Sequence, residues 1–208
     1  MVAPAVTESS IVILGNIASG KTTLMNILST TLAVPRLAED TSSNPYLARL
    51  RSEPSRWCLH NQMWFLVEAH GARMKAAAKG GVADHSVEEV ALHTPVFHAK
   101  KWLTLDEVSL IGVVSTKLLH GLPKPDLYVA LSAPPGVLVS RVSDRGRSQD
   151  VPPSEEYLRA VSVQREDFLQ TTETPVLHID SNLVDFRTKS GQFGVRDAVA
   201  AALWGPGT

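Results

Sequence analysis

Residues 15–24, with the sequence GNIASGKTTL, follow an apolar run at positions 11–14 and constrain the fold more than any other stretch of the chain. Gly15, Gly20, Lys21 and Thr22 satisfy the pattern G-x-x-x-x-G-K-[ST] between a strand-like and a helical segment, the context that this motif requires. In such a loop, backbone N–H groups approach phosphates, the lysine contacts the outer phosphates and the threonine hydroxyl can bind Mg²⁺. An ordinary glycine turn with a solvated lysine is the weaker interpretation.

The candidate phosphate-binding residues are therefore Gly15, Asn16, Ile17, Ala18, Ser19, Gly20, Lys21, Thr22 and Thr23.

The composition fits a domain with a sizeable core, because 44% of its 208 residues are hydrophobic and the formal net charge is −1. Near-neutral charge argues against a broad nucleic-acid interface, which needs an excess of clustered Lys and Arg. The single cysteine, Cys58, cannot form an internal disulfide, and we expect a buried, inert thiol. No apolar run approaches the roughly 18 residues needed to span a bilayer. We expect a cytoplasmic chain without nucleic-acid or membrane partners.

Short β-prone runs alternate with helical patterns along the chain. Strands are predicted at residues 10–15, 34–39, 81–86, 125–133 and 175–180. Helices are predicted at residues 21–33, 55–79 (as one or two helices), 87–102 with an interruption near Pro95, 105–122, 136–146, 154–170 and 195–204. This alternation predicts an α/β fold, with a mostly parallel sheet covered on both faces. No internal repeat or linker is evident, so we predict a single domain over residues 1–208.

Two carboxylates are expected beside the phosphate loop. Glu39 ends the second predicted strand and Asp84 ends the third, and the carboxyl ends of parallel strands meet at one edge of a sheet. One carboxylate would hold Mg²⁺ with Thr22, directly or through water, and the other would accept a proton from an attacking hydroxyl. Ordinary surface carboxylates at strand ends remain the alternative interpretation.

A basic stretch follows the fourth predicted strand. The segment RVSDRGRSQD carries Arg141, Arg145 and Arg147 in a Gly- and Ser-containing context bounded by Pro152. This spacing suits a mobile lid at about residues 144–153, which would bring cations over the transferred phosphoryl group and exclude water. A solvated basic turn is the alternative.

Together these motifs resemble the deoxynucleoside kinase family, which includes deoxycytidine, deoxyguanosine, deoxyadenosine and mitochondrial-type thymidine kinases. The resemblance runs from the phosphate loop to the end of the chain. It rests on GNIASGKTTL, AED with NPYLARLRSEP, NQMWFL, ADHS, PDLYVALSAPP, RVSDRGRSQD followed by EYL, and IDSNLVDF. It implies a phosphate-loop kinase fold with a five-stranded parallel sheet, helices on both sides, an arginine-rich lid and a homodimer built through long helices.

The resemblance also implies roles for individual residues. Glu39 matches the base that takes the proton from the nucleoside 5′-hydroxyl, and Gln62 matches the glutamine that pairs with the edge of the base. Asp84 matches the acidic residue near Mg²⁺, while Arg145 and Arg147 match lid arginines. ATP or another nucleoside triphosphate would be the donor, and Arg141 would assist in binding it.

Several positions depart from the family pattern. His85 stands where the family has arginine, and a histidine supplies that charge only when protonated. Arg51 stands where the family commonly has a tyrosine that helps hold the sugar 3′-hydroxyl, and Asp150 replaces the glutamate partner of that tyrosine. Thr94 falls where a phenylalanine usually stacks on the base, although Phe97 is near in sequence.

Ala69 and Val90 occupy positions where purine- and cytosine-accepting members place an arginine and an aspartate. Small apolar residues there favour a thymidine-like pyrimidine or a modified base. We therefore hypothesise an ATP-dependent kinase acting on the 5′-hydroxyl of a (deoxy)nucleoside. Two alternatives remain open: a kinase for a nucleoside monophosphate or another small alcohol, and a non-catalytic nucleotide-binding protein.

Overall fold

The computed structural model describes residues 8–38, 41–145 and 153–205. Within them, five strands form a parallel sheet in the order β2-β3-β1-β4-β5. The strands are β1 (Ser10–Gly15), β2 (Arg36–Leu37), β3 (Gly81–Ala83), β4 (Leu127–Ser132) and β5 (Val176–Asp180). The predicted parallel α/β sheet is confirmed.

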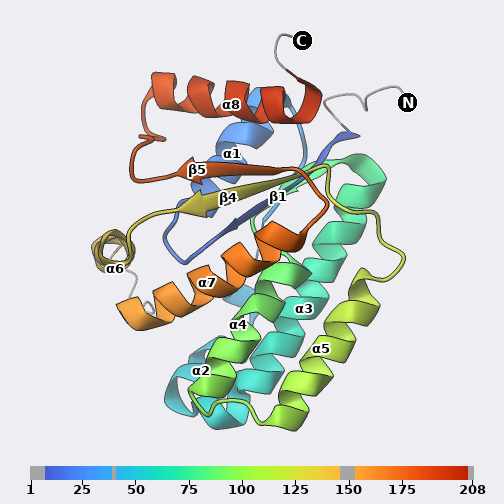
Figure 1. Cartoon of the computed structure of the whole chain (residues 1–208), viewed down its shortest axis with the longest axis vertical. Helices are drawn as coiled ribbons and strands as arrows, with labels where there is room; N and C mark the ends of the chain where they lie inside the picture. Colours follow the sequence, from blue (N-terminus) through green and yellow to red (C-terminus); the bar gives the residue numbers. More distant parts are fainter. Residues whose placement is uncertain (1–7, 39–40, 146–152, 206–208) are drawn as a thin grey trace.

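Helices cover both faces of this sheet (Figure 1). They are α1 (Lys21–Leu32), α2 (Leu47–Ser52), α3 (Pro54–Lys79), α4 (Val87–Ala99), α5 (Leu105–Leu119), α6 (Pro135–Asp144), α7 (Glu155–Thr171) and α8 (Lys189–Trp204), with a 3₁₀ turn, η2 (Thr41–Ser43). Helices α1 and α8 lie on one face, whereas α3, α4, α5 and α7 lie on the other (Figure 1).

The central strand β1 divides the hydrophobic core between the two faces, because successive side chains of a strand point in opposite directions. Ile11 and Ile13 pack in a cluster with residues of α1 and α8. Val12 and Leu14 pack in a second cluster that includes Leu169 of α7. Every residue of β1 is buried, as expected for the centre of a parallel sheet with both faces covered.

A third hydrophobic cluster joins α3, α4 and α5 away from the sheet. It includes Cys58, which is fully buried, so the expected burial of this thiol is confirmed. Desolvation by burial, helped by the negative charge of Glu107, raises the pKa of the Cys58 thiol to about 12. The thiol is therefore protonated, and hence poorly nucleophilic, near neutral pH.

The predicted interruption near Pro95 is wrong, because α4 runs continuously from Val87 to Ala99 with this proline inside it. Proline lacks the N–H that would reach the carbonyl of Ala91, and its ring crowds that carbonyl. Pro95 is exposed and Ala91 partly exposed, so water can reach that side of the helix. Phe97 and other buried side chains hold the helix in place on either side of the missing hydrogen bond.

Other element boundaries also differ from expectation. The second strand has two residues and the third has three, instead of six each, and the short charged helix α2 was not predicted. Helix α8 begins at Lys189 rather than at residue 195, because the Thr188 hydroxyl accepts a hydrogen bond from the backbone N–H of Gly191, 3.0 Å away. This cap satisfies an N-terminal donor and offsets the poor helix propensity of glycine.

Candidate active site

The phosphate loop joins β1 to α1 at the carboxyl edge of the sheet. Two positions of the loop require glycine for steric reasons. A Cβ on Gly15 would lie 2.9 Å from the backbone oxygen of Leu131, and Gly20 has a φ of 100° where it caps α1. A backbone hydrogen bond of 3.2 Å from Ser19 to the Asn16 carbonyl closes the turn of the loop. The loop therefore has the compact form in which backbone N–H groups can converge on phosphate oxygens.

Lys21 lies over this loop rather than pointing into solvent. Its ammonium donates to the backbone oxygen of Gly15 at 2.5 Å and to that of Asn16 at 3.2 Å. The positive charge is therefore held at the mouth of the loop, where the outer phosphates of a nucleotide would lie.

Thr22 and Asp84 are brought together from separate elements. The Thr22 hydroxyl, in the first turn of α1, donates to Asp84 Oδ2 at 2.6 Å, and Asp84 directly follows β3. Oxygen ligands of this kind suit Mg²⁺, which is usually bound by one or two protein groups together with substrate phosphates. Among the described residues no cluster of three or more His, Cys, Asp and Glu side chains that could hold a metal ion is found. Glu39, the third predicted ligand, lies outside the described residues.

His85 lies beside this pair and is only 7% exposed. Its Nδ1 is 3.6 Å from Asp84 Oδ1, too far for a hydrogen bond, and has no hydrogen-bond partner among the described residues. The histidine that replaces the family arginine is thus positioned next to the predicted metal-binding carboxylate.

Gln62 and Thr94 occupy the interface between α3 and α4. The Gln62 side chain is 3% exposed, and its Nε2 donates to the backbone oxygen of Val90 at 3.0 Å. Thr94, one helical turn beyond Val90, has a buried hydroxyl with no partner among the described residues. Ala69 is buried on α3. These side chains share a helical interface, whereas Arg51 is exposed on α2, and its predicted partner Asp150 lies outside the described residues.

Of the predicted lid arginines, Arg141 contacts the phosphate loop. From α6 its guanidinium donates to the backbone oxygen of Ala18 at 3.4 Å and to the backbone oxygen of Ser181 at 2.8 Å. Arg145 is exposed just beyond the end of α6. Arg147 and most of the predicted lid, residues 144–153, lie outside the described residues.

A buried polar network behind the loop was not predicted. Arg165 of α7 is 3% exposed and forms two hydrogen bonds with Glu89 of α4, from Nη2 at 2.5 Å and from Nε at 3.2 Å. His93 Nε2 lies 4.0 Å from Glu89 Oε1, and its Nδ1 shares a hydrogen bond of 2.6 Å with the Tyr157 hydroxyl. The side chain of Asn16, in the phosphate loop, reaches the same helix α7.

The sequence contains a signal for this network. On α7 the buried residues Leu158, Val161, Arg165 and Leu169 follow one helical face, so a charged residue interrupts an otherwise apolar stripe. Such a residue is almost never buried unless it is paired.

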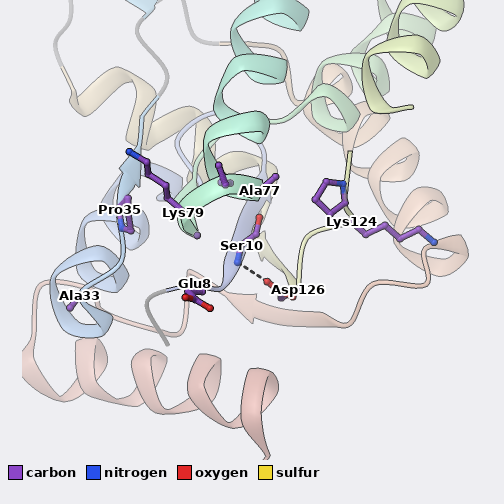
Figure 2. Close-up of a pocket in the computed structure, with 12 residues that line it drawn as sticks. Glu8, Ser10, Ala33, Pro35, Ala77, Lys79, Lys124 and Asp126 are labelled. Atoms are coloured by element: carbon purple, nitrogen blue, oxygen red, sulfur yellow. Dashed lines mark hydrogen bonds between the residues drawn. The ribbon is translucent and has the colours of Figure 1, made fainter. Parts of the chain in front are cut away.

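A cavity of about 790 Å³ lies at the opposite edge of the sheet (Figure 2). Glu8, Ser10, Lys79 and Asp126 are among its lining residues, and Ser10 N donates to Asp126 Oδ2 at 2.7 Å. Ligands of open α/β sheets bind outside the carboxyl ends of the strands. This cavity at the amino ends is therefore separate from the candidate active site.

The phosphate loop follows the central strand of a five-stranded parallel sheet. Lys21 lies over the loop, and Thr22 is hydrogen-bonded to Asp84. This arrangement defines the phosphate-loop kinase fold. A family model described as "Deoxynucleoside kinase" matches residues 11–200. The chain belongs to the deoxynucleoside kinase family and is a phosphotransferase whose acceptor is an alcohol group.

Two curated relatives are similar over most of their length. The deoxyadenosine/deoxycytidine kinase of Bacillus subtilis (strain 168) is 27% identical over 170 residues, covering 78% of this chain and 77% of that protein. The deoxyguanosine kinase of the same organism is 25% identical over 198 residues, covering 90% of this chain and 93% of that protein.

Solved structures share the fold. A deoxyadenosine kinase from M. mycoides with bound dCTP superimposes with a TM-score of 0.78 at 19% identity, covering 92% of this chain and 99% of that one. The same kinase with bound dATP gives a TM-score of 0.76 at 21% identity. As to membranes, the helices of the described segments are all too short or too polar to cross one.

Proposed function

We propose that this kinase transfers the terminal phosphoryl group of ATP, or of another nucleoside triphosphate, to the 5′-hydroxyl of a deoxynucleoside in the presence of Mg²⁺. The contact of 2.6 Å between Thr22 and Asp84, beside Lys21, is the observation that carries the proposal. It joins a hydroxyl and a carboxylate next to the loop that receives the phosphates, which is the donor set that Mg²⁺ prefers.

The residues in and around the phosphate loop have distinct roles in this mechanism. Thr22 and Asp84 would hold Mg²⁺, which neutralises charge between the outer phosphates when bound. Lys21 binds the outer phosphates and stabilises the negative charge on the transferred group. Arg145 and Arg147 would approach that group from the lid, while Arg141 supports the loop from α6. Together these groups orient the phosphoryl donor and favour the transition state.

On the acceptor side, Glu39 is proposed as the general base that takes the proton of the 5′-hydroxyl, and Gln62 as the residue that pairs with the edge of the base. Asp84, His85, Arg51 and Asp150 are proposed to surround the sugar and its hydroxyls. Because the Gln62 amide nitrogen already donates to the Val90 carbonyl, its carbonyl oxygen is the group best placed to accept a hydrogen bond from the base.

The preferred acceptor is proposed to be a pyrimidine or a modified deoxynucleoside. Ala69 and Val90 support this choice, since both are buried, apolar and without a group that would recognise a purine edge. Relatives named as deoxyadenosine and deoxyguanosine kinases make purines the competing choice. Neither Ala69 nor Val90 can donate a side-chain hydrogen bond, so discrimination would depend on pocket shape and on Gln62.

The test is phosphate transfer from Mg-ATP, followed by mass spectrometry, with a panel of the four deoxynucleosides, their ribonucleoside counterparts, nucleoside monophosphates and sugars. A product that carries one phosphate on the 5′-hydroxyl of a deoxynucleoside supports the proposal. Transfer to monophosphates or sugars alone would support the alternative acceptor class. Bound ATP with no transfer to any acceptor would overturn the proposed reaction.

We further propose that the kinase is a homodimer joined through α3 and α5. Large apolar side chains are exposed on both helices, namely Val67 (62%) and Met74 (53%) on α3, and Leu110 (47%) and Val113 (59%) on α5. Apolar surface concentrated on adjacent helices is typical of a protein interface. A second copy of the same chain would cover it through a two-fold interface.

A further inference from the structure

The buried pair of Arg165 and Glu89 is connected to the phosphate loop through one side chain. Asn16 is the second residue of the loop motif, and its Nδ2 donates to the backbone oxygen of Leu158 at 3.1 Å and to Ser162 Oγ at 2.9 Å. The Oδ1 atom of the same amide accepts from Arg165 Nη2 at 3.4 Å. Both ends of the Asn16 amide are therefore fixed by helix α7.

Arg165 is fixed in turn by Glu89. Its two hydrogen bonds to the two carboxylate oxygens form the bidentate arrangement that guanidinium groups favour. The side chains of Arg165 and Glu89 are 4% and 10% exposed. A salt bridge at this depth has little competition from water, so its geometry is well defined.

The charge state of Glu89 matches this pairing. Burial acts to raise the pKa of Glu89, but the charge and hydrogen bonds of Arg165, with smaller effects from Lys21 and His93, hold it below its ordinary value. Glu89 is therefore ionised at neutral pH. An ionised carboxylate makes stronger hydrogen bonds with a guanidinium than a protonated one, so the position of Arg165 is well fixed.

We propose that Arg165 and Glu89 are positioning residues for nucleotide binding: Glu89 fixes the Arg165 guanidinium, which together with helix α7 holds Asn16 and the start of the phosphate loop. The proposal rests on the proposed use of ATP. Neither residue is assigned contact with a substrate, and both act through the loop.

A purely structural role predicts a different result, because loss of folded protein lowers kcat without changing the KM of either substrate. A positioning role instead raises the KM for ATP and leaves the KM for the nucleoside unchanged. Three variants separate the two roles: Asn16→Ala, Arg165→Met, and the double variant Glu89→Gln with Arg165→Met, which removes both charges together.

Arg159→Met is the matched control. It lies on the same helix, is exposed, and pairs only with Glu155 one turn away among the described contacts. We expect this control to keep the kinetic constants of the wild type.

We expect Arg165→Met to raise the KM for ATP several-fold or more, because it removes the hydrogen bond to Asn16 Oδ1 and leaves the buried Glu89 carboxylate unpaired. The double variant leaves no unpaired buried charge but still lacks the contact with Asn16, so it should raise the same constant several-fold, as should Asn16→Ala. The proposal is overturned if the double variant keeps the wild-type KM for ATP, or if both KM values change together. If Arg165→Met does not fold, the KM values of Asn16→Ala and of the double variant test the proposal. A wild-type KM for ATP in Asn16→Ala refutes it.

Calorimetric titration of each variant with Mg-ATP tests the same prediction, because it measures the affinity for Mg-ATP without turnover. If the wild type phosphorylates no nucleoside, the proposed function fails, whereas the calorimetric affinities for Mg-ATP still test the role of the ion pair. Equal affinities in the wild type, Asn16→Ala and the double variant would refute the positioning role by itself.

Discussion

Substitution of Thr22 by valine isolates the hydrogen bond on which the proposed metal site depends. Valine keeps the branched shape of threonine but cannot donate to Asp84 Oδ2, which lies 2.6 Å from the hydroxyl. The acceptor is 5% exposed, whereas Thr22 is an exposed residue. A hydrogen bond to a charged group is worth ~1.5–3 kcal/mol, and we expect ~1–2 kcal/mol here because water can reach the donor.

That loss of stability has a measurable thermal consequence. For a domain of about 150–250 residues, each kcal/mol lowers Tm by ~2–4 °C, so Thr22→Val should melt about 2–8 °C below the wild type. Thr22→Ser keeps the hydroxyl and should stay close to the wild type. Differential scanning calorimetry of the three proteins at one concentration makes the comparison.

The effect on turnover should be larger and should depend on Mg²⁺. If the hydroxyl contributes ~1.5–3 kcal/mol to the transition state as a metal ligand, the rate falls about 10- to 150-fold, since 1.36 kcal/mol is a factor of ten. Part of this loss should be recovered as Mg²⁺ is raised, because a weakened site fills at higher concentration. A Thr22→Val enzyme within twofold of the wild type at every Mg²⁺ concentration would refute the assignment of this pair.

Three further predictions concern other parts of the molecule. Glu39→Gln should lower kcat by about 10²-fold or more while Mg-ATP binding persists in calorimetry, and an unchanged rate would contradict its role as the base. Burial lowers the pKa of His93 to about 4 against the opposing effect of Glu89. Its ordinary value is ~6.5, so the unfolded chain binds the proton first, and the free energy of unfolding should fall as pH drops from about 6.5 towards 4. Urea denaturation of the wild type and His93→Gln across this range checks the sign, and identical pH dependence in both would exclude His93 as the cause. Val113→Asp should convert the proposed dimer to a monomer in size-exclusion chromatography with light scattering, whereas Val163→Asp, the same change at an exposed position of α7, should leave the dimer intact; a monomeric wild type would contradict the proposed dimer.

The parallel sheet and the phosphate loop could be predicted because their signals are local. The apolar run ending at Gly15 and the spacing to Lys21 specify a strand, a turn and a helix start within a dozen residues. The alternation of strands and helices predicts parallel strands, so Asp84 was expected at the same edge of the sheet as the loop. The strand order, which makes β3 the neighbour of β1 and brings Asp84 to Thr22, was not predicted.

What could not be predicted depends on contacts between distant elements. The continuity of α4 through Pro95 depends on buried neighbours such as Phe97, which outweigh the loss of one hydrogen bond at an exposed position. Helix α8 begins early because the Thr188 hydroxyl caps it, a local signal that the two nearby glycines obscured. The pairing of Arg165 with Glu89 spans 76 positions in the chain, and no short spacing in the sequence specifies it.

The pairing register of β1 with β3 sets where Asp84, the proposed metal-binding carboxylate, lies. Val12 is opposite Ala83, so Asp84 follows at a level fixed by the backbone hydrogen bonds of two neighbouring strands. A shift of one residue in β3 would move that carboxylate by ~3.3 Å along the strand and turn it to the other face of the sheet. A single-residue insertion before Asp84 would therefore abolish magnesium-dependent turnover even in a variant that keeps its sheet, its phosphate loop and its affinity for ATP in the absence of metal.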